Sequence, residues 1–286
     1  MGHRLSSVVA TSDCGLVEDS DAWFQIASLT FAVDGVAYDD RWDDEARRVL
    51  SAPRAKVTTA GPTPGSFLIA MERSAGRDVI IVPTGSRFSA AAAAARLACE
   101  GLDLPLADRE VFLIDSRTAG PGLTLLVRNA VRAARNGASV REIYRGISRA
   151  IPTIHIVGWI QETASLLGSG RMGRLAGIIG TRVGISPIFA LRNGRMRLVT
   201  LTEQAPSAIE HMATVLCEKE QLPGSQACIH HVDALALAAA LGDRLSGAGL
   251  ASVSIQEATP AVGVHLGRGA VVAAVIAPPS NDLPRD

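Results

Sequence analysis

Continuous apolar runs alternate with helix-forming segments through the first half of the chain, and this alternation limits the fold most strongly. The runs that are typical of strands lie at 6–11, 26–33, 78–84 and 109–116. Helices are expected at 43–51, 64–75, 89–100 and 121–136. Apolar strands separated by helices form mostly parallel sheets that are covered by helices. We therefore expect an N-terminal α/β domain over residues 1–150.

The second half of the chain follows a different pattern. Strands are expected at 152–160, 226–232, 251–258 and 271–277, with helices near 204–220 and 233–247. Within 185–201, Asn193–Gly194 separates two apolar runs, which is the strongest short signal for a β-hairpin in this chain. A hairpin combined with helical crossovers predicts a second α/β domain, with a mixed sheet, over residues 151–286.

Composition and charge exclude several classes of protein. The chain has 28 basic and 28 acidic residues and only 4% aromatic residues, so it lacks the basic excess and the stacking surfaces of nucleic-acid-binding proteins. No apolar run approaches the roughly 18 residues of a membrane span, and the first residues do not resemble a signal peptide. The scattered cysteines form no CxxC pair, which is typical of reduced thiols. We expect a cytoplasmic protein without integral membrane association.

Ser89 stands directly before six consecutive alanines, where the strand at 78–84 gives way to a helix. Serine is a preferred N-cap and alanine is the strongest helix former, so an ordinary helix start explains the pattern. The unpaired N–H groups and the positive dipole end of a helix also bind anions. Alanine side chains leave room beside the helix for an apolar ligand. The two interpretations are compatible, and the residues alone leave both open.

Thr58 and Thr59 precede GPTPG (61–65), a rigid segment before the helix expected at 64–75. Ordinary turn chemistry accounts for the glycines and prolines. In parallel sheets, however, ligands bind beyond the carboxyl ends of the strands, where loops enter helices. Two hydroxyl-bearing helix entries, at Thr59 and Ser89, are therefore in a position to converge on one anion.

Three further patterns were weighed as candidate sites. GSGRMG (168–173) fits the dinucleotide motif G-x-G-x-x-G, but it follows a helical segment rather than a strand, so we reject that interpretation. His230 and His231 are adjacent on a strand and face opposite ways, so we expect no metal there and no cofactor. A serine hydrolase with Ser89 as nucleophile and His265 as base remains an alternative, although the chain lacks a G-x-S-x-G elbow.

Five segments, in the right order, resemble the DegV family of two-domain bacterial proteins that bind a fatty acid. They are VTTAGPTPGSF (57–67), VPTGSRFSAAAAAA (82–95), VFLIDSRTAGPGL (111–123), LLGSGRMGRLAGIIGTRVGISPIFALRNGRM (166–196) and GVHLGRGAVV (263–272). The resemblance covers nearly the whole chain. It implies a mostly parallel N-terminal sheet flanked by helices, a mixed C-terminal sheet with a hairpin, and a ligand cleft between the two domains.

The resemblance also implies a site and a function. Thr59 and Ser89 match the hydroxyls that hold the carboxylate of a long-chain fatty acid, and Arg171 and His265 match groups at the rim around that carboxylate. A buried carboxylate requires such donors, and each buried CH₂ of the acyl chain contributes about 0.8 kcal/mol. The family role is that of a carrier rather than an enzyme: it presents the acyl chain to a fatty acid kinase, and the acyl phosphate enters phospholipid synthesis.

The chain departs from the family pattern at several positions. Ala60 and Gly61 replace a serine and a glutamine, alanines occupy 90–95, and the family's opening TDS becomes Thr11-Ser12-Asp13. The lost polar positions at 60, 61 and 90–95 concern acyl selectivity and kinase docking, whereas the sequence assigns no role to the Thr11-Ser12-Asp13 loop. The alternative to a kinase-linked carrier is therefore a lipid-responsive regulatory sensor without a kinase partner.

Overall fold

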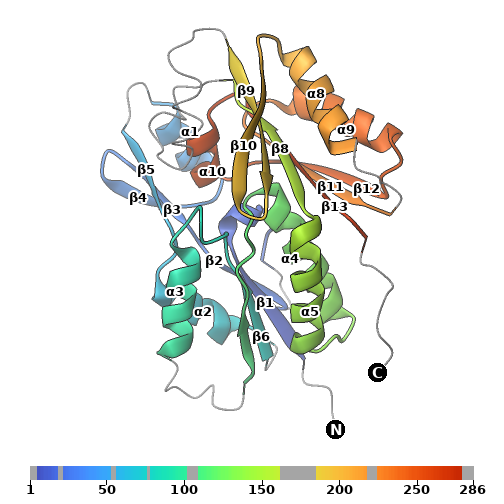
Figure 1. The fold of residues 1–286 in the computed structure, drawn as a ribbon. Coiled ribbons are helices and arrows are strands. Elements are labelled where there is room, and N and C mark those ends of the chain that lie inside the picture. Colours follow the sequence, from blue (N-terminus) through green and yellow to red (C-terminus); the bar gives the residue numbers. More distant parts are fainter. Residues whose placement is uncertain are drawn as a thin grey trace.

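The computed structural model describes residues 5–18, 22–52, 56–75, 78–101, 109–161, 185–217 and 224–278. Figure 1 shows two helix-covered sheets, with a small third sheet beside them. The expected architecture of two α/β units, one built on a parallel sheet and one on a mixed sheet, is confirmed. Within the described residues, no helix is both long enough and apolar enough to cross a membrane.

The first sheet is fully parallel. Its strands run in the order β2 (Phe24–Ala27), β1 (Ser6–Thr11), β6 (Asp78–Val82) and β7 (Val111–Leu113). Every residue of β1 and β6 is buried, because helices cover both faces. The helices on one face are α2 (Pro64–Arg73) and α3 (Ala91–Glu100); those on the other are α4 (Pro121–Arg135) and α5 (Val140–Ala150).

The segment 26–33, expected as one strand, forms parts of two strands in different sheets, so that expectation was wrong. The second part, β3 (Thr30–Val33), lies in a three-stranded antiparallel sheet with β4 (Val36–Asp39) and β5 (Val57–Ala60). Asp34 and Gly35 both have positive φ, and they turn β3 tightly into β4. A short helix, α1 (Asp44–Leu50), packs on this sheet, with the Asp43 side chain as its N-cap.

The second sheet is mixed. Its strands run in the order β10 (Arg195–Thr202), β9 (Ser186–Arg192), β8 (His155–Trp159), β13 (Val271–Ile276), β11 (Gln226–His231) and β12 (Ser252–Glu257). The predicted β9–β10 hairpin is confirmed, and Asn193 and Gly194 have φ of 49° and 70°, as a type I′ loop requires. On one face, α8 (Ala205–Cys217) and α9 (Leu235–Gly247) cover the sheet.

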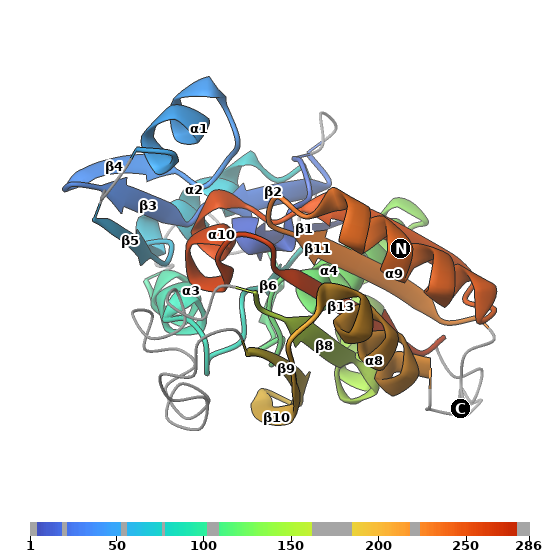
Figure 2. The ribbon, with the colours of Figure 1, turned by 90° about the horizontal axis from the view of Figure 1, so that it is seen from above.

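Helix α4 is the layer that joins the two large sheets. Its apolar side chains, such as Leu126, belong to one core cluster with Val8 of the parallel sheet and Val272 of the mixed sheet. A short helix, α10 (Pro260–Leu266), follows β12 and packs against β3 and β5 (Figure 2). The C-terminal part of the chain therefore contacts the small N-terminal sheet through α10, and α10 forms one wall of the space between the two large sheets.

Candidate ligand-binding cavity

A mostly apolar cavity lies where the parallel sheet, the mixed sheet and α10 meet. The centres of water-sized spheres can occupy about 150 Å³ of it. Its apolar lining comes from both halves of the chain and includes Leu29, Phe88, Ile156, Phe189, Met196 and Val272. A cavity of this kind suits a ligand that is largely hydrocarbon.

Three of the four residues predicted from the sequence line this cavity: Thr59, Ser89 and His265. Thr59 Oγ1 and His265 Nε2 are 2.7 Å apart and share a hydrogen bond. Gly61 lies between Thr59 and Ser89, and a Cβ atom at Gly61 would stand 3.1 Å from Ser89 Oγ. The chain thus brings two hydroxyls and an imidazole to one end of the cavity. Arg171 lies outside the described residues.

Ser89 is not the N-cap of α3, so that prediction was wrong by one position. The helix begins at Ala91, and Ala90 stands at the N-cap without a side-chain bond. The reason is a turn before the helix, in which the N–H groups of Phe88 and Ser89 donate to the carbonyl of Gly85. Ser89 Oγ accepts from the Ala91 N–H at 3.1 Å. Its own hydroxyl hydrogen has no acceptor among the described residues and is available to a ligand.

Glycines on both sides of His265 indicate a loop, but the structure places His265 on the helix α10. The helix is held by Asp40, whose carboxylate accepts from the Ala261 N–H at 2.7 Å and from the Ser12 hydroxyl at 2.6 Å. Burial raises the pKa of Asp40. Because β5 carries Thr59 and α10 carries His265, this carboxylate helps to fix the polar end of the cavity.

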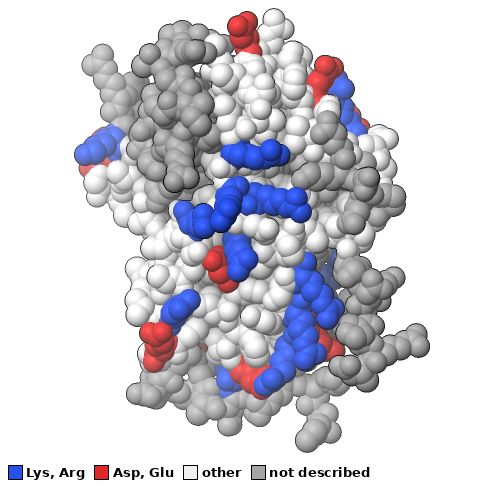
Figure 3. Space-filling model, in the orientation of Figure 1, with Lys and Arg blue, Asp and Glu red and all other residues white. Residues whose placement is uncertain are grey.

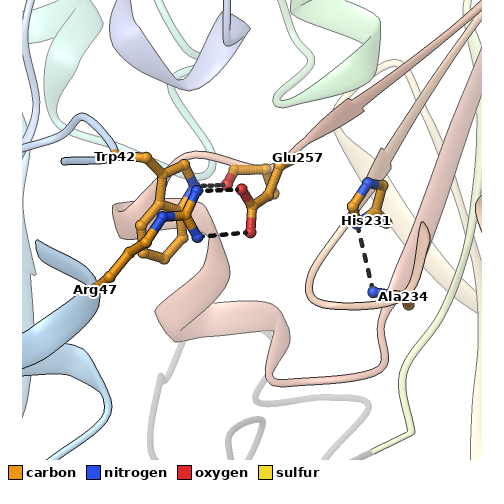
Figure 4. Close-up of polar contacts among 6 residues, drawn as sticks. Trp42, Arg47, His231, Ala234 and Glu257 are labelled. Carbon is orange, nitrogen blue, oxygen red and sulfur yellow. Dashed lines mark hydrogen bonds and ion pairs between the residues drawn. The ribbon is translucent and has the colours of Figure 1, made fainter. Parts of the chain in front are cut away.

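Two contacts nearer the surface also join the N-terminal segment that contains α1 to the segment just before α10 (Figure 4). Trp42 Nε1 donates to the carbonyl of Ala258 at 2.8 Å, and Arg47 pairs with Glu257 at 3.0 Å. The Arg47 guanidinium also lies over the Trp42 ring, 4.8 Å from its centroid. The ion pair is exposed and contributes little by itself.

A second polar group, Asp13, lines the cavity on the side of the parallel sheet. Thr84 Oγ1 donates to its carboxyl group at 2.7 Å, and the Gly120 N–H approaches at 3.4 Å. Burial raises the pKa of Asp13 to about 6. Sequence reasoning left the Thr11-Ser12-Asp13 loop without a role. Its position at the end of β1, at the carboxyl edge of a parallel sheet, could have indicated that Asp13 lies at a ligand site.

His230 and His231 point to opposite sides of β11, as expected. His230 is fully buried, and its Nε2 lies 2.9 Å from Thr124 Oγ1 on α4. Burial lowers the pKa of His230 to about 3, so this ring stays neutral. His231 Nδ1 accepts from the Ala234 N–H at 3.4 Å (Figure 4). The described part of the chain contains no cluster of three metal-ligating side chains.

The fold and the cavity define a class of protein: a two-domain α/β protein that encloses a mostly apolar cavity with hydroxyl and imidazole groups at one end. The chain belongs to the DegV family, because the family model described as "Uncharacterised protein, DegV family" matches residues 8–278. A DegV domain-containing protein of Mycobacterium bovis is 28% identical over 274 residues, which cover 92% of this chain and 94% of that protein.

Solved structures with the same fold include proteins with bound fatty acids. The fatty acid kinase B3 protein of Streptococcus pneumoniae, loaded with linoleic acid, has a TM-score of 0.85 at 17% identity and covers 96% of this chain and 99% of its own. A DegV family protein of Eubacterium eligens, loaded with heptadecanoic acid, has a TM-score of 0.83 at 19% identity and covers 95% and 99%. These likenesses establish the fold.

Proposed function

We propose that this protein binds a long-chain fatty acid in the cavity, with the carboxylate at Thr59 and Ser89. The observation that carries the proposal is the convergence of Thr59, Ser89 and His265 at one end of an otherwise apolar cavity. A carboxylate there receives hydroxyl donors, and His265 lies beside it. Arg171 completes the rim of the site in this proposal, and the acyl chain follows the apolar lining between the two sheets.

The protein acts as a carrier and not as a serine hydrolase in this proposal. A hydrolase would require His265 to accept the proton of Ser89, but His265 Nε2 is bonded to Thr59. The Ser89 hydroxyl accepts from the Ala91 N–H, and no hydrogen bond joins it to a base among the described residues. A carrier in the cytoplasm would present the acyl carboxylate to a fatty acid kinase, a role supported by the structural likeness to the pneumococcal fatty acid kinase B3 protein.

Replacing either hydroxyl residue is expected to weaken fatty acid binding. Removal of one hydrogen bond to a charged group costs about 1.5–3 kcal/mol, so Ser89→Ala and Thr59→Val should each lower affinity roughly 10- to 100-fold. Affinity for palmitate is measured by calorimetry on delipidated protein, and native mass spectrometry identifies any acid that co-purifies.

Ser246→Ala is the matched control, because Ser246 is exposed on α9, away from the cavity. It should bind palmitate as the unmodified protein does. The proposal fails if the unmodified protein binds no fatty acid of C14–C18. The assignment of the carboxylate site fails if both cavity variants keep full affinity. The kinase role is tested separately, by mixing loaded protein with the fatty acid kinase of the same cell and ATP and measuring acyl phosphate.

A further inference from the structure

The outer face of the β9–β10 hairpin carries an unbalanced cluster of arginines. Arg192 and Arg195 are register partners across the hairpin, and Arg197 follows on the same face of β10. Their neighbours Leu191 and Met196 point the other way, into the acyl cavity. Figure 3 shows basic side chains gathered across the middle of this face of the molecule, over the hairpin.

The positive charges of these arginines repel one another, and no acidic side chain among the described residues forms an ion pair with them. Like charges directly opposite on antiparallel strands are destabilising. Some exposed arginines of the protein have acidic partners: Arg141 pairs with Glu110, and Arg244 pairs with Glu210. No such pair involves Arg192, Arg195 or Arg197 among the described residues. The unliganded protein therefore maintains a local repulsion that an anion would relieve.

The three arginines surround a hollow and do not lie on a flat surface. Between β8, β9, β10 and the end of α8, the centres of water-sized spheres can occupy about 260 Å³. Val157 and Val215 contribute to its apolar floor, and His155 lies at its edge. Arg192, Arg195 and Arg197 all border this hollow, so a compact anion there can be approached by three guanidiniums.

We propose that this hollow is a binding site for a phosphate group, carried by a soluble phosphate compound or by a lipid head group. A single carboxylate has one charge and two oxygens, whereas a phosphate monoester has nearly two charges and three acceptor oxygens at neutral pH. The planar guanidinium forms paired hydrogen bonds with phosphate oxygens. Three guanidiniums around one hollow match the phosphate better. The zero net charge of the chain conceals this local excess.

The arginines of the hollow do not line the acyl cavity, and Thr59, Ser89 and His265 do not line the hollow. The two sites share only part of an apolar wall, since Ile156, Leu191 and Met196 border both. The phosphate site therefore does not depend on the proposed function, and the two can be tested separately on one set of variants.

The test compares Arg195→Gln/Arg197→Gln with a control of equal charge change, Arg145→Gln/Arg149→Gln, on exposed positions of α5. Calorimetry at low ionic strength measures the binding of pyrophosphate, and sedimentation measures binding to vesicles that contain phosphatidic acid, whose head group is a phosphate monoester, against vesicles of phosphatidylcholine alone. We expect the hairpin variant to lose at least tenfold in affinity, with the control unchanged and palmitate binding retained in both. A loss of affinity for pyrophosphate identifies a soluble phosphate compound as the source. A loss of affinity for phosphatidic acid vesicles alone identifies a lipid head group.

The proposal is overturned if the unmodified protein binds neither pyrophosphate nor phosphatidic acid vesicles, or if both double variants lose the same affinity. Binding of polyglutamate that depends on Arg195 and Arg197, without any binding of phosphate, also overturns it, since the partner would then be an acidic protein segment. Circular dichroism melting shows whether the variants are folded, and Arg195→Lys/Arg197→Lys separates guanidinium geometry from charge: this variant should recover only part of the affinity.

Discussion

Replacing Asp13 with asparagine should raise the free energy of unfolding of the ligand-free protein by about 3 kcal/mol at pH 8 and leave it nearly unchanged at pH 4. The pKa of Asp13 is raised by burial from 3.8 to about 6 in the folded protein. As pH rises from about 4 to 6, the unfolded chain loses this proton before the folded protein does, so the Asp13 contribution to stability falls. A shift of roughly two pKa units corresponds to about 3 kcal/mol. An asparagine side chain is uncharged at every pH in this range, so its burial does not carry this loss of free energy.

Urea unfolding at a series of pH values between 4 and 8 measures this effect as the difference between the variant and the unmodified protein. The subtraction removes contributions from buried groups that do not interact with Asp13, such as His230. Asp115→Asn is the control of opposite sign. Asp115 accepts from the Ser86 hydroxyl and from two N–H groups, and its pKa is lowered although partial burial opposes this. Parallel pH profiles of Asp13→Asn and the unmodified protein would contradict the prediction.

Replacing Gly158 with alanine should reduce fatty acid affinity by more than tenfold and destabilise the protein by about 1–3 kcal/mol. Gly158 and Phe189 are register partners on β8 and β9, and a Cβ at Gly158 would stand 2.4 Å from Phe189 Cζ. The ring is buried and lines the acyl cavity. Because the surrounding core is closely packed, the ring can move only into the cavity, where it would occupy the place of the acyl chain.

The double variant Gly158→Ala/Phe189→Leu tests this cause. Leucine removes the ring that the new methyl group displaces, so much of the lost stability should return in a double-mutant cycle. Calorimetry with palmitate and urea unfolding measure the two effects on the same preparations. If Gly158→Ala keeps full affinity while the protein remains folded, the ring does not move into the space that the acyl chain occupies. The stability result stands regardless of which ligand the cavity accepts.

The parts of the fold predicted from the sequence are those with a strong local pattern. The run at 78–84 has four consecutive apolar residues at 79–82, the run at 271–277 is apolar throughout, and Asn193–Gly194 specifies a tight turn. The small sheet was missed because β4 and β5 are short and largely exposed on one face, although Asp34–Gly35 is the same kind of hairpin signal. Helix α5 was also missed. Its buried Val140, Ile143 and Ile147 are spaced as in a helix, but charged residues surround them.

The candidate site was predicted only in part. The family resemblance indicated Thr59, Ser89 and His265, and local chemistry alone placed Ser89 at a helix start. The turn at Gly85 that shifts this start by one position depends on packing against Thr118, which no local pattern reveals: the Gly85 N–H donates to the Thr118 carbonyl, and Thr118 leaves no room for a Cβ on Gly85. Asp13 was not recognised, because two of the groups that contact its carboxyl group, Thr84 and Gly120, lie more than 70 residues away in the sequence.

The position of β13 determines when the cavity can form during synthesis. This strand lies in the middle of the mixed sheet, between β8 and β11, yet it is the last strand among the described residues. The bond between Thr59 and His265 likewise joins residues 206 positions apart. The parallel sheet can therefore fold while the ribosome is still at work, but the mixed sheet and the polar end of the cavity have to wait until α10 and β13 have been synthesised. Nascent or truncated chains that end before residue 271 would expose apolar strands and have no finished binding site.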